Sequence, residues 1–127
     1  MRSILDLTYV AVVSLFNRND DGSTTLAIEA TKRYFNYLRE RGVKRVVIGG
    51  GTGEWPYLTP RERLTLLELA GHYFETVVFN VTHFEAGERS GLIAAANAKA
   101  QEAIFLPEFY YSDSSPEEHL RNAEVLL

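Results

Sequence analysis

Residues 45–59 read Arg45-Val46-Val47-Ile48-Gly49-Gly50-Gly51-Thr52-Gly53-Glu54-Trp55-Pro56-Tyr57-Leu58-Thr59. The run from Val46 to Ile48 predicts a strand buried on both faces, because β-branched side chains suit a pleated sheet and no polar residue interrupts the run. The glycines that follow allow a loop that turns its backbone N–H groups and the Thr52 hydroxyl toward a ligand. Such a loop fits either a cradle for an anion or only a tight turn. A phosphate is the weaker choice of anion, because no Gly-Lys-Ser/Thr sequence follows.

Length and composition limit the classes of protein to which this chain can belong. The chain has 127 residues, 46% of them hydrophobic and 24% charged, which is enough for one ordinary globular core and too few for two. We therefore expect residues 1–127 to form one segment. The net charge of −4, without a cluster of basic residues, argues against nucleic acid or a membrane surface as a partner. No leader or membrane span is predicted, and the absence of cysteine is compatible with our expectation of a cytoplasmic protein.

The histidines do not form a metal-binding pattern. His72, His83 and His119 are far apart in the chain, and no spacing typical of a zinc site connects them. Thiolate ligands are excluded because there is no cysteine. We expect neither a metal nor a cofactor.

A strand followed by a helix is predicted four times along the chain. The predicted strands cover residues 9–16, 46–48, 76–82 and 103–106, and the predicted helices cover 24–41, 60–71, 88–100 and the residues from 116 onward. Two of these helices begin with the same pattern of a hydroxyl residue, a proline, any residue and a glutamate, at Thr59 and at Ser115. The pattern is that of a capping box with proline in the first turn.

The alternation of strands and helices implies crossover connections and a parallel sheet, with ligands bound at the carboxyl ends of the strands. Two architectures fit, a doubly wound sheet and part of a (β/α)8 barrel. A complete barrel needs about 250 residues, so four units make half of one. We favour the half barrel because the last helix has no stop signal and a four-stranded parallel sheet would expose both edges. The expected fold is therefore α/β, the first four units of a TIM barrel.

The motifs resemble those of a known family. Residues 49–59, with Glu62 and Arg63, are similar to the G-T-T-G-E-x-x-x-L-[ST]-x-x-E-R signature of the dihydrodipicolinate synthase and N-acetylneuraminate lyase family. Residues 13–16 with 21–23 resemble its opening strand and turn. The triplet Phe109-Tyr110-Tyr111 resembles the Pro-Tyr-Tyr at the end of its fourth strand. The resemblance spans nearly the whole chain.

This resemblance implies a lyase or aldolase that holds pyruvate or a related 2-oxo acid as a Schiff base on a lysine of the sixth strand. Thr52 and Tyr111 are implied as catalytic residues that pass a proton along a hydroxyl relay. The implied substrate-binding residues are Gly50, Gly51, Thr52, Gly53, Tyr110 and His83. In the synthases the second tyrosine crosses to a neighbouring subunit, so a homo-oligomer, dimer or tetramer, is implied.

Several positions depart from the family pattern. Gly51 stands where the family has threonine or serine, which removes one hydroxyl from the site. Residues 81–85 are bulkier than the family's glycine-containing segment, and His83 among them is either a general acid or an ordinary loop histidine. Glu54 is predicted to brace the loop through local N–H groups, and Trp55 to pack beneath it or at a subunit contact.

The lysines of this chain are poor candidates for the imine. Lys32, Lys44 and Lys99 are predicted on helices or at the amino end of a strand, away from the catalytic face. One hypothesis is therefore the N-terminal part of a lyase whose Schiff-base lysine is absent from this chain. The alternative is a free-standing dimeric half barrel that binds a small carboxylate without catalysis.

Overall fold

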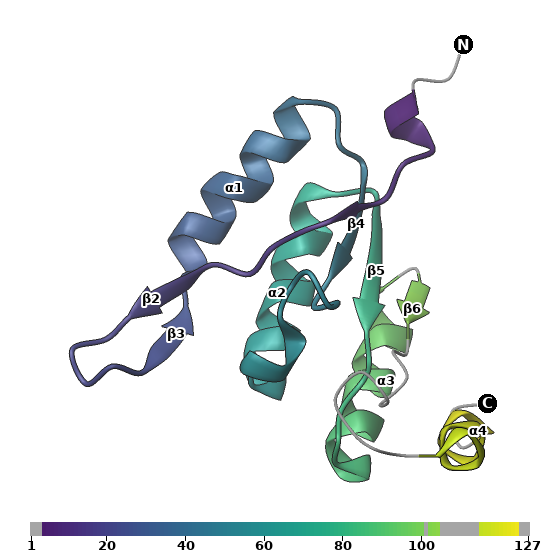
Figure 1. Cartoon of the computed structure of the whole chain (residues 1–127). Coiled ribbons are helices and arrows are strands. Elements are labelled where there is room, and N and C mark those ends of the chain that lie inside the picture. Colours follow the sequence, from purple (N-terminus) through teal and green to yellow (C-terminus); the bar gives the residue numbers. More distant parts are fainter. Residues whose placement is uncertain (1–3, 101, 105–114, 125–127) are drawn as a thin grey trace.

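The computed structural model describes residues 4–100, 102–104 and 115–124 (Figure 1). Its centre is a sheet of four parallel strands in the order β1-β4-β5-β6. These strands are β1 (Val10–Ala11), β4 (Arg45–Ile48), β5 (Thr76–Asn80) and β6 (Glu102–Ile104). Val46 pairs with Val10 on one side and with Val77 on the other, so the predicted strand at 46–48 lies inside the sheet.

Helices lie between and after the parallel strands, and the first three connect one parallel strand to the next as crossovers. They are α1 (Ile28–Glu40), α2 (Pro60–Tyr73), α3 (Ala86–Lys99) and α4 (Pro116–Glu124), with 3-10 turns η1 (Ile4–Asp6) and η2 (Trp55–Tyr57). Figure 1 shows the chain passing from β4 through a loop into α2 and from β5 into α3. The predicted alternation and the predicted parallel sheet are confirmed.

The core lies between the sheet and the helices. Alternate residues of β4, Val46 and Ile48, are buried there together with Val77 and Phe79 of β5. Phe35 of α1 is completely buried, and its ring centre lies 5.3 Å from that of Phe74 in an edge-on contact. The face of α1 that carries Phe35 thus packs against the end of α2.

A hairpin replaces part of the predicted first strand and helix. The first strand ends at Ala11, and β2 (Phe16–Arg18) pairs antiparallel with β3 (Thr24–Leu26), so that the helix starts only at Ile28. Figure 1 shows this hairpin projecting from the sheet. The prediction was wrong here because β-branched threonines favour a strand and Gly22, at φ 84°, closes the turn.

The other helix and strand boundaries differ from the predicted ones by a few residues. Gly71 does not end α2, which runs on to Tyr73, and α3 begins at Ala86 rather than at residue 88. The third strand ends at Asn80 rather than at 82. The fourth strand begins at Glu102, while residues 105 and 106 lie outside the described residues.

Both predicted capping boxes are confirmed. The backbone N–H of Glu62 donates to Thr59 Oγ1 at 3.2 Å, and the Thr59 N–H donates to Glu62 Oε2 at 2.9 Å. At α4 the same two bonds join Ser115 and Glu118, at 3.3 and 2.7 Å. Local sequence therefore determines where these helices begin.

Glu62 also makes a hydrogen bond outside its own helix, so its replacement is expected to affect stability. Its Oε1 accepts a hydrogen bond of 2.9 Å from the backbone N–H of Leu26, so one carboxylate caps α2 and secures the end of the hairpin. We expect Glu62→Ala to lower the free energy of unfolding by about 1–2 kcal/mol in urea titrations. Glu68→Ala is the control, because Glu68 is exposed and lies 4.0 Å from Lys99. Equal losses in the two variants would contradict the bridging role.

The hairpin turn is expected to respond to acid. Ser23 donates to Asp21 Oδ1 from its backbone N–H at 2.9 Å and from its hydroxyl at 2.6 Å, which holds the pKa of Asp21 below its usual 3.8. The stabilisation by this carboxylate is therefore complete above the unfolded pKa and is lost as pH falls through the lower folded pKa. An NMR titration should show this lowered pKa and its return toward 3.8 in Ser23→Ala. A wild-type value at or above 3.8 would refute it.

Candidate functional site

The glycine loop, residues 49–54, offers unoccupied donors at the carboxyl end of β4. The backbone N–H groups of Gly50, Gly51, Thr52 and Gly53 make no hydrogen bond to any part of the chain that the structure describes. The loop is closed by other bonds, from Glu54 N–H to the Gly51 carbonyl at 3.0 Å and from Trp55 N–H to the Gly50 carbonyl at 3.4 Å. Such a group of backbone donors is suited to an anion.

Glycine is required at two positions of the loop for different reasons. Gly49 has φ 62°, a conformation that other residues rarely adopt. A Cβ on Gly53 would lie 3.0 Å from the Gly49 nitrogen and 3.2 Å from its Cα, so the two ends of the loop touch. At Gly51, by contrast, a Cβ would meet nothing within 4 Å. The hydroxyl that the family pattern has at this position would fit, and its absence is a chemical difference alone.

Two polar side chains brace the loop from neighbouring segments. Ser14 donates its hydroxyl to the Gly53 carbonyl at 2.7 Å, and Asn80 donates its amide to the Gly49 carbonyl at 2.7 Å. Both side chains are buried. Glu54, which was predicted to brace the loop, is exposed in a left-handed conformation, and its carboxylate makes no hydrogen bond to the described residues. That prediction was wrong, and the loop is held instead by donors to its carbonyls from the neighbouring segments.

Sequence reasoning missed these two residues, although each carries a signal. Asn80 is a polar residue at the end of the apolar run 76–79, and Ser14 interrupts the apolar run 9–16. A polar side chain inside an apolar run must find a partner when it is buried. The partner is not visible in the sequence, since Ser14 bonds to a residue 39 positions away.

Arg63 of α2 lies beneath the loop. Its side chain is completely buried, and its two terminal nitrogens donate to the carbonyls of Thr82, at 2.6 Å, and Asn80. The guanidinium carbon lies 5.6 Å from the ring centre of Trp55 and 5.8 Å from that of Phe79. Burial lowers the pKa of Arg63 to about 10, which leaves the side chain cationic at neutral pH.

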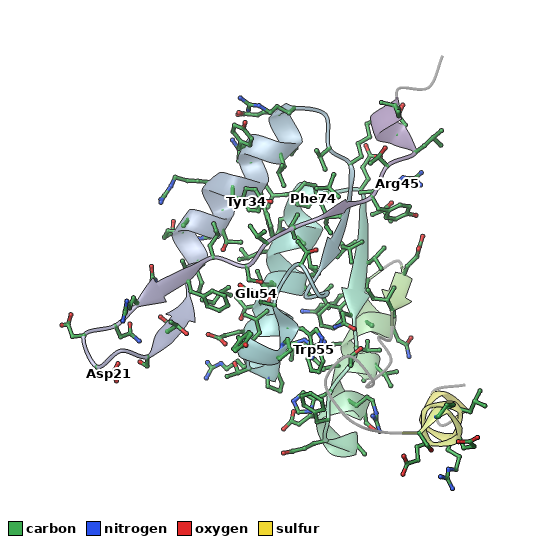
Figure 2. The ribbon with its side chains drawn as sticks, viewed as in Figure 1. Asp21, Tyr34, Arg45, Glu54, Trp55 and Phe74 are labelled. Carbon is green, nitrogen blue, oxygen red and sulfur yellow. The ribbon has the colours of Figure 1, made fainter. Side chains whose placement is uncertain are left out.

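Trp55 packs under the loop, as predicted. Only 2% of it is exposed, and Figure 2 shows it beside the beginning of α2, on the side of β5. Its ring centre lies 5.1 Å from that of Phe84, in the segment after β5. The tryptophan thus links the glycine loop to the neighbouring strand end.

His83 lies at the same edge of the sheet as the loop. It follows β5 by three positions, is half-buried, and accepts a hydrogen bond of 3.0 Å at Nδ1 from the Glu85 N–H. In a neutral ring this bond leaves Nε2 as the nitrogen that carries the proton. Thr52 is exposed in the loop. Tyr110 and Tyr111 lie outside the described residues, so the predicted relay between Thr52 and Tyr111 stays a prediction.

The lysines lie where they were predicted, away from the carboxyl ends of the strands. Lys32 of α1 pairs with Glu29 at 2.8 Å, and Lys44, just before β4, pairs with Asp6 at 2.7 Å. Lys99 is the last residue of α3. Within the described ranges, no group of three or more metal-ligating side chains comes together, and no helix has the length and apolar character needed to cross a membrane.

Comparison with known proteins supports this assignment of the fold. No family model matches the chain. It is 34% identical over 102 residues to 4-hydroxy-tetrahydrodipicolinate synthase of Sulfurihydrogenibium sp., a match that covers 80% of this chain and 30% of the relative. A pyruvate complex of a 2-keto-3-deoxygluconate aldolase variant from Sulfolobus solfataricus superposes with a TM-score of 0.77 at 18% identity, over 93% of this chain and 40% of that one. The 2-keto-3-deoxygluconate aldolase of Picrophilus torridus gives 0.79 at 20% identity, over 94% and 42%.

The sheet order, the crossovers and these superpositions define the chain as a half barrel of the (β/α)8 class, which confirms the predicted fold. The sequence match confirms the resemblance of this chain to the N-terminal part of the dihydrodipicolinate synthase family. It spans about 30% of the length of the curated relative.

Proposed function

We propose that this chain is the carboxylate-binding part of a dihydrodipicolinate synthase-like lyase or aldolase that acts on pyruvate or a related 2-oxo acid through a Schiff base. The observation that carries the proposal is the row of N–H groups from Gly50 to Gly53, which have no partner among the described residues and lie in a loop braced by Ser14 and Asn80. The relative from Sulfurihydrogenibium sp. is a synthase of this family, and the aldolase from Sulfolobus solfataricus was solved with pyruvate.

In this proposal the loop N–H groups and the Thr52 hydroxyl hold the substrate carboxylate. Thr52 then passes a proton to Tyr111, because a hydroxyl is too weak a base to act alone. His83 and Tyr110 contact the rest of the substrate. Residues 1–127 act as one half-barrel segment, and the working protein is a homo-oligomer.

The imine lysine belongs to another part of the barrel in this proposal. The lysines at 32 and 44 are held in ion pairs, and the third ends α3, so none faces the loop. An amine that forms a Schiff base must reach the substrate carbonyl while the carboxylate is bound. The chain is therefore expected to bind a 2-oxo acid without transforming it.

The test combines binding with covalent trapping. Titration of the isotope-labelled chain with sodium pyruvate should shift the amide resonances of residues 50–53, and Thr52→Val should weaken binding on the order of tenfold by removing one hydrogen bond to a charged group. Borohydride reduction in the presence of pyruvate should leave the chain unlabelled. Covalent labelling would overturn the assignment of the lysines, and unshifted loop amides would overturn the proposal itself.

One observation favours the alternative, a free-standing dimer. Among the described residues, β1 and β6 are paired on one side only, and such open edges favour association with another sheet. Sedimentation of the 127-residue chain separates the two ideas. A well-folded dimer supports the alternative, whereas an aggregating or molten chain supports a segment of a larger barrel.

A further inference from the structure

Arg63 is a buried cation without a counter-ion in the part of the chain that the structure describes. Its side chain is 0% exposed, and its hydrogen bonds go to two backbone carbonyls. Its Nε has no hydrogen-bond partner among the described residues. The two carbonyls accept from the terminal nitrogens but leave Nε unpaired among the described residues and the net charge uncompensated. Such a charge is costly to bury.

The positive charge of Arg63 lies next to the start of the glycine loop. A Cβ built on Gly49 would lie 3.8 Å from Arg63 Nε, so the side chain lies directly under the start of the loop. Asn80 also connects Arg63 to the loop. Its backbone carbonyl accepts from Arg63, and its side-chain amide donates to the Gly49 carbonyl. The buried rings of Trp55 and Phe79 line the guanidinium. Because Arg63 and these two rings are buried, water screens the charge only weakly on its own side of the loop.

The second buried arginine does not share this position. Arg89 of α3 donates to the His83 carbonyl at 3.2 Å, at the end of the next strand. The acidic side chain of the loop itself, that of Glu54, is exposed. Arg63 is thus the buried arginine that lies against the start of the glycine loop.

We propose that Arg63 determines the preference of the glycine loop for a carboxylate over a neutral group, acting through its charge from beneath the loop and without touching the ligand. Backbone N–H groups alone donate to a neutral carbonyl or to an anion, whereas a buried positive charge favours the anion specifically. The inference rests on the proposed 2-oxo acid site. It assigns Arg63 as a specificity-determining residue of that site.

The test compares a charged ligand with a neutral one of the same shape. Dissociation constants for sodium pyruvate and for pyruvamide are measured by NMR on the wild-type chain, Arg63→Gln and Arg63→Lys. The ratio between the two ligands should fall on the order of tenfold in Arg63→Gln, through weaker pyruvate binding, and should be largely kept in Arg63→Lys. Arg61→Gln is the matched control, because Arg61 is exposed on the same helix and its loss should leave the ratio unchanged.

The outcomes separate a charge effect from a structural one. If Arg63→Gln weakens pyruvate and pyruvamide equally, Arg63 only ties the strand ends together and the inference is overturned. If Arg63→Gln does not fold, the lysine variant decides, since a folded Arg63→Lys that has lost the ratio refutes a role for charge and one that keeps it supports that role.

Sodium acetate distinguishes this inference from the proposed function. Acetate has the carboxylate but no 2-oxo group. If the wild type binds acetate as tightly as pyruvate, and Arg63→Gln loses both, the carboxylate preference stands and the 2-oxo acid proposal fails. If the wild type binds neither anion, both fail.

Discussion

Replacing Gly53 with alanine is expected to abolish carboxylate binding by the glycine loop and to lower the free energy of unfolding by about 1–3 kcal/mol. The new Cβ would lie 3.0 Å from the Gly49 nitrogen and 3.3 Å from the Gly50 nitrogen, and these are backbone atoms that cannot rotate away. The loop would have to open where its donors converge. Ser14 would also lose its geometry to the Gly53 carbonyl, which it now meets at 2.7 Å.

Gly51→Ala is the matched control for that variant. It adds the same methyl group two positions earlier, where nothing lies within 4 Å. Urea unfolding and pyruvate titration of both variants make the measurement. We expect Gly51→Ala to unfold within about 0.5 kcal/mol of the wild type. If Gly53→Ala changed unfolding and pyruvate binding no more than Gly51→Ala does, the close approach of the two ends of the loop would not matter for stability or binding.

Removing the Asn80 side chain is expected to be the more damaging change to stability. The side chain donates to the Gly49 carbonyl at 2.7 Å and accepts at Oδ1 from the Thr82 hydroxyl, at 2.7 Å, and from its N–H, at 3.1 Å. All of these groups lie in a region that is closed to solvent. Asn80→Ala leaves buried donors and an acceptor without partners, and each such group costs about 1–3 kcal/mol. We expect a total loss of about 2–4 kcal/mol.

Asn36→Ala provides the comparison for Asn80→Ala. Asn36 also uses its amide in two hydrogen bonds, to Glu40 and from Arg39, but on the solvent side of α1. Its loss should cost no more than about 0.5 kcal/mol, because water replaces the lost partners. Equal losses in the two variants would mean that burial of the Asn80 network does not matter. Hydrogen exchange of the Gly49 and Thr82 amides would locate the loosening in Asn80→Ala.

The parts of the fold that could be predicted depend on short-range physics. The strand at 46–48 follows from three β-branched residues in a row, and the start of α2 follows from Thr59, Pro60 and Glu62, which bond to one another within one turn. The hairpin at 16–26 could not be predicted in the same way. Its last strand is secured by Glu62 across 36 positions, and a helix was an equally good local choice for residues 24–27.

In the candidate site, too, the features set by neighbouring residues could be predicted and those set by distant residues could not. The glycine loop, with Thr52 and Gly53, was visible in the sequence because several glycines directly follow an apolar run. Its supports were not. Ser14, Asn80 and Arg63 reach the loop or the next strand from three separate segments, and nothing in their immediate neighbours identifies the carbonyls to which they donate.

By itself the sequence determined the alternation of the four parallel strands with helices, the caps of α2 and α4, and the position of the loop, because each of these depends on residues a few positions apart. Only the tertiary structure decided that the loop N–H groups have no partner in the part of the chain that it describes and that a buried arginine lies beneath Gly49. Parallel strands bring distant residues together at one edge of the sheet. The electrostatics of that edge arise from this convergence and cannot be derived from any one stretch of the chain.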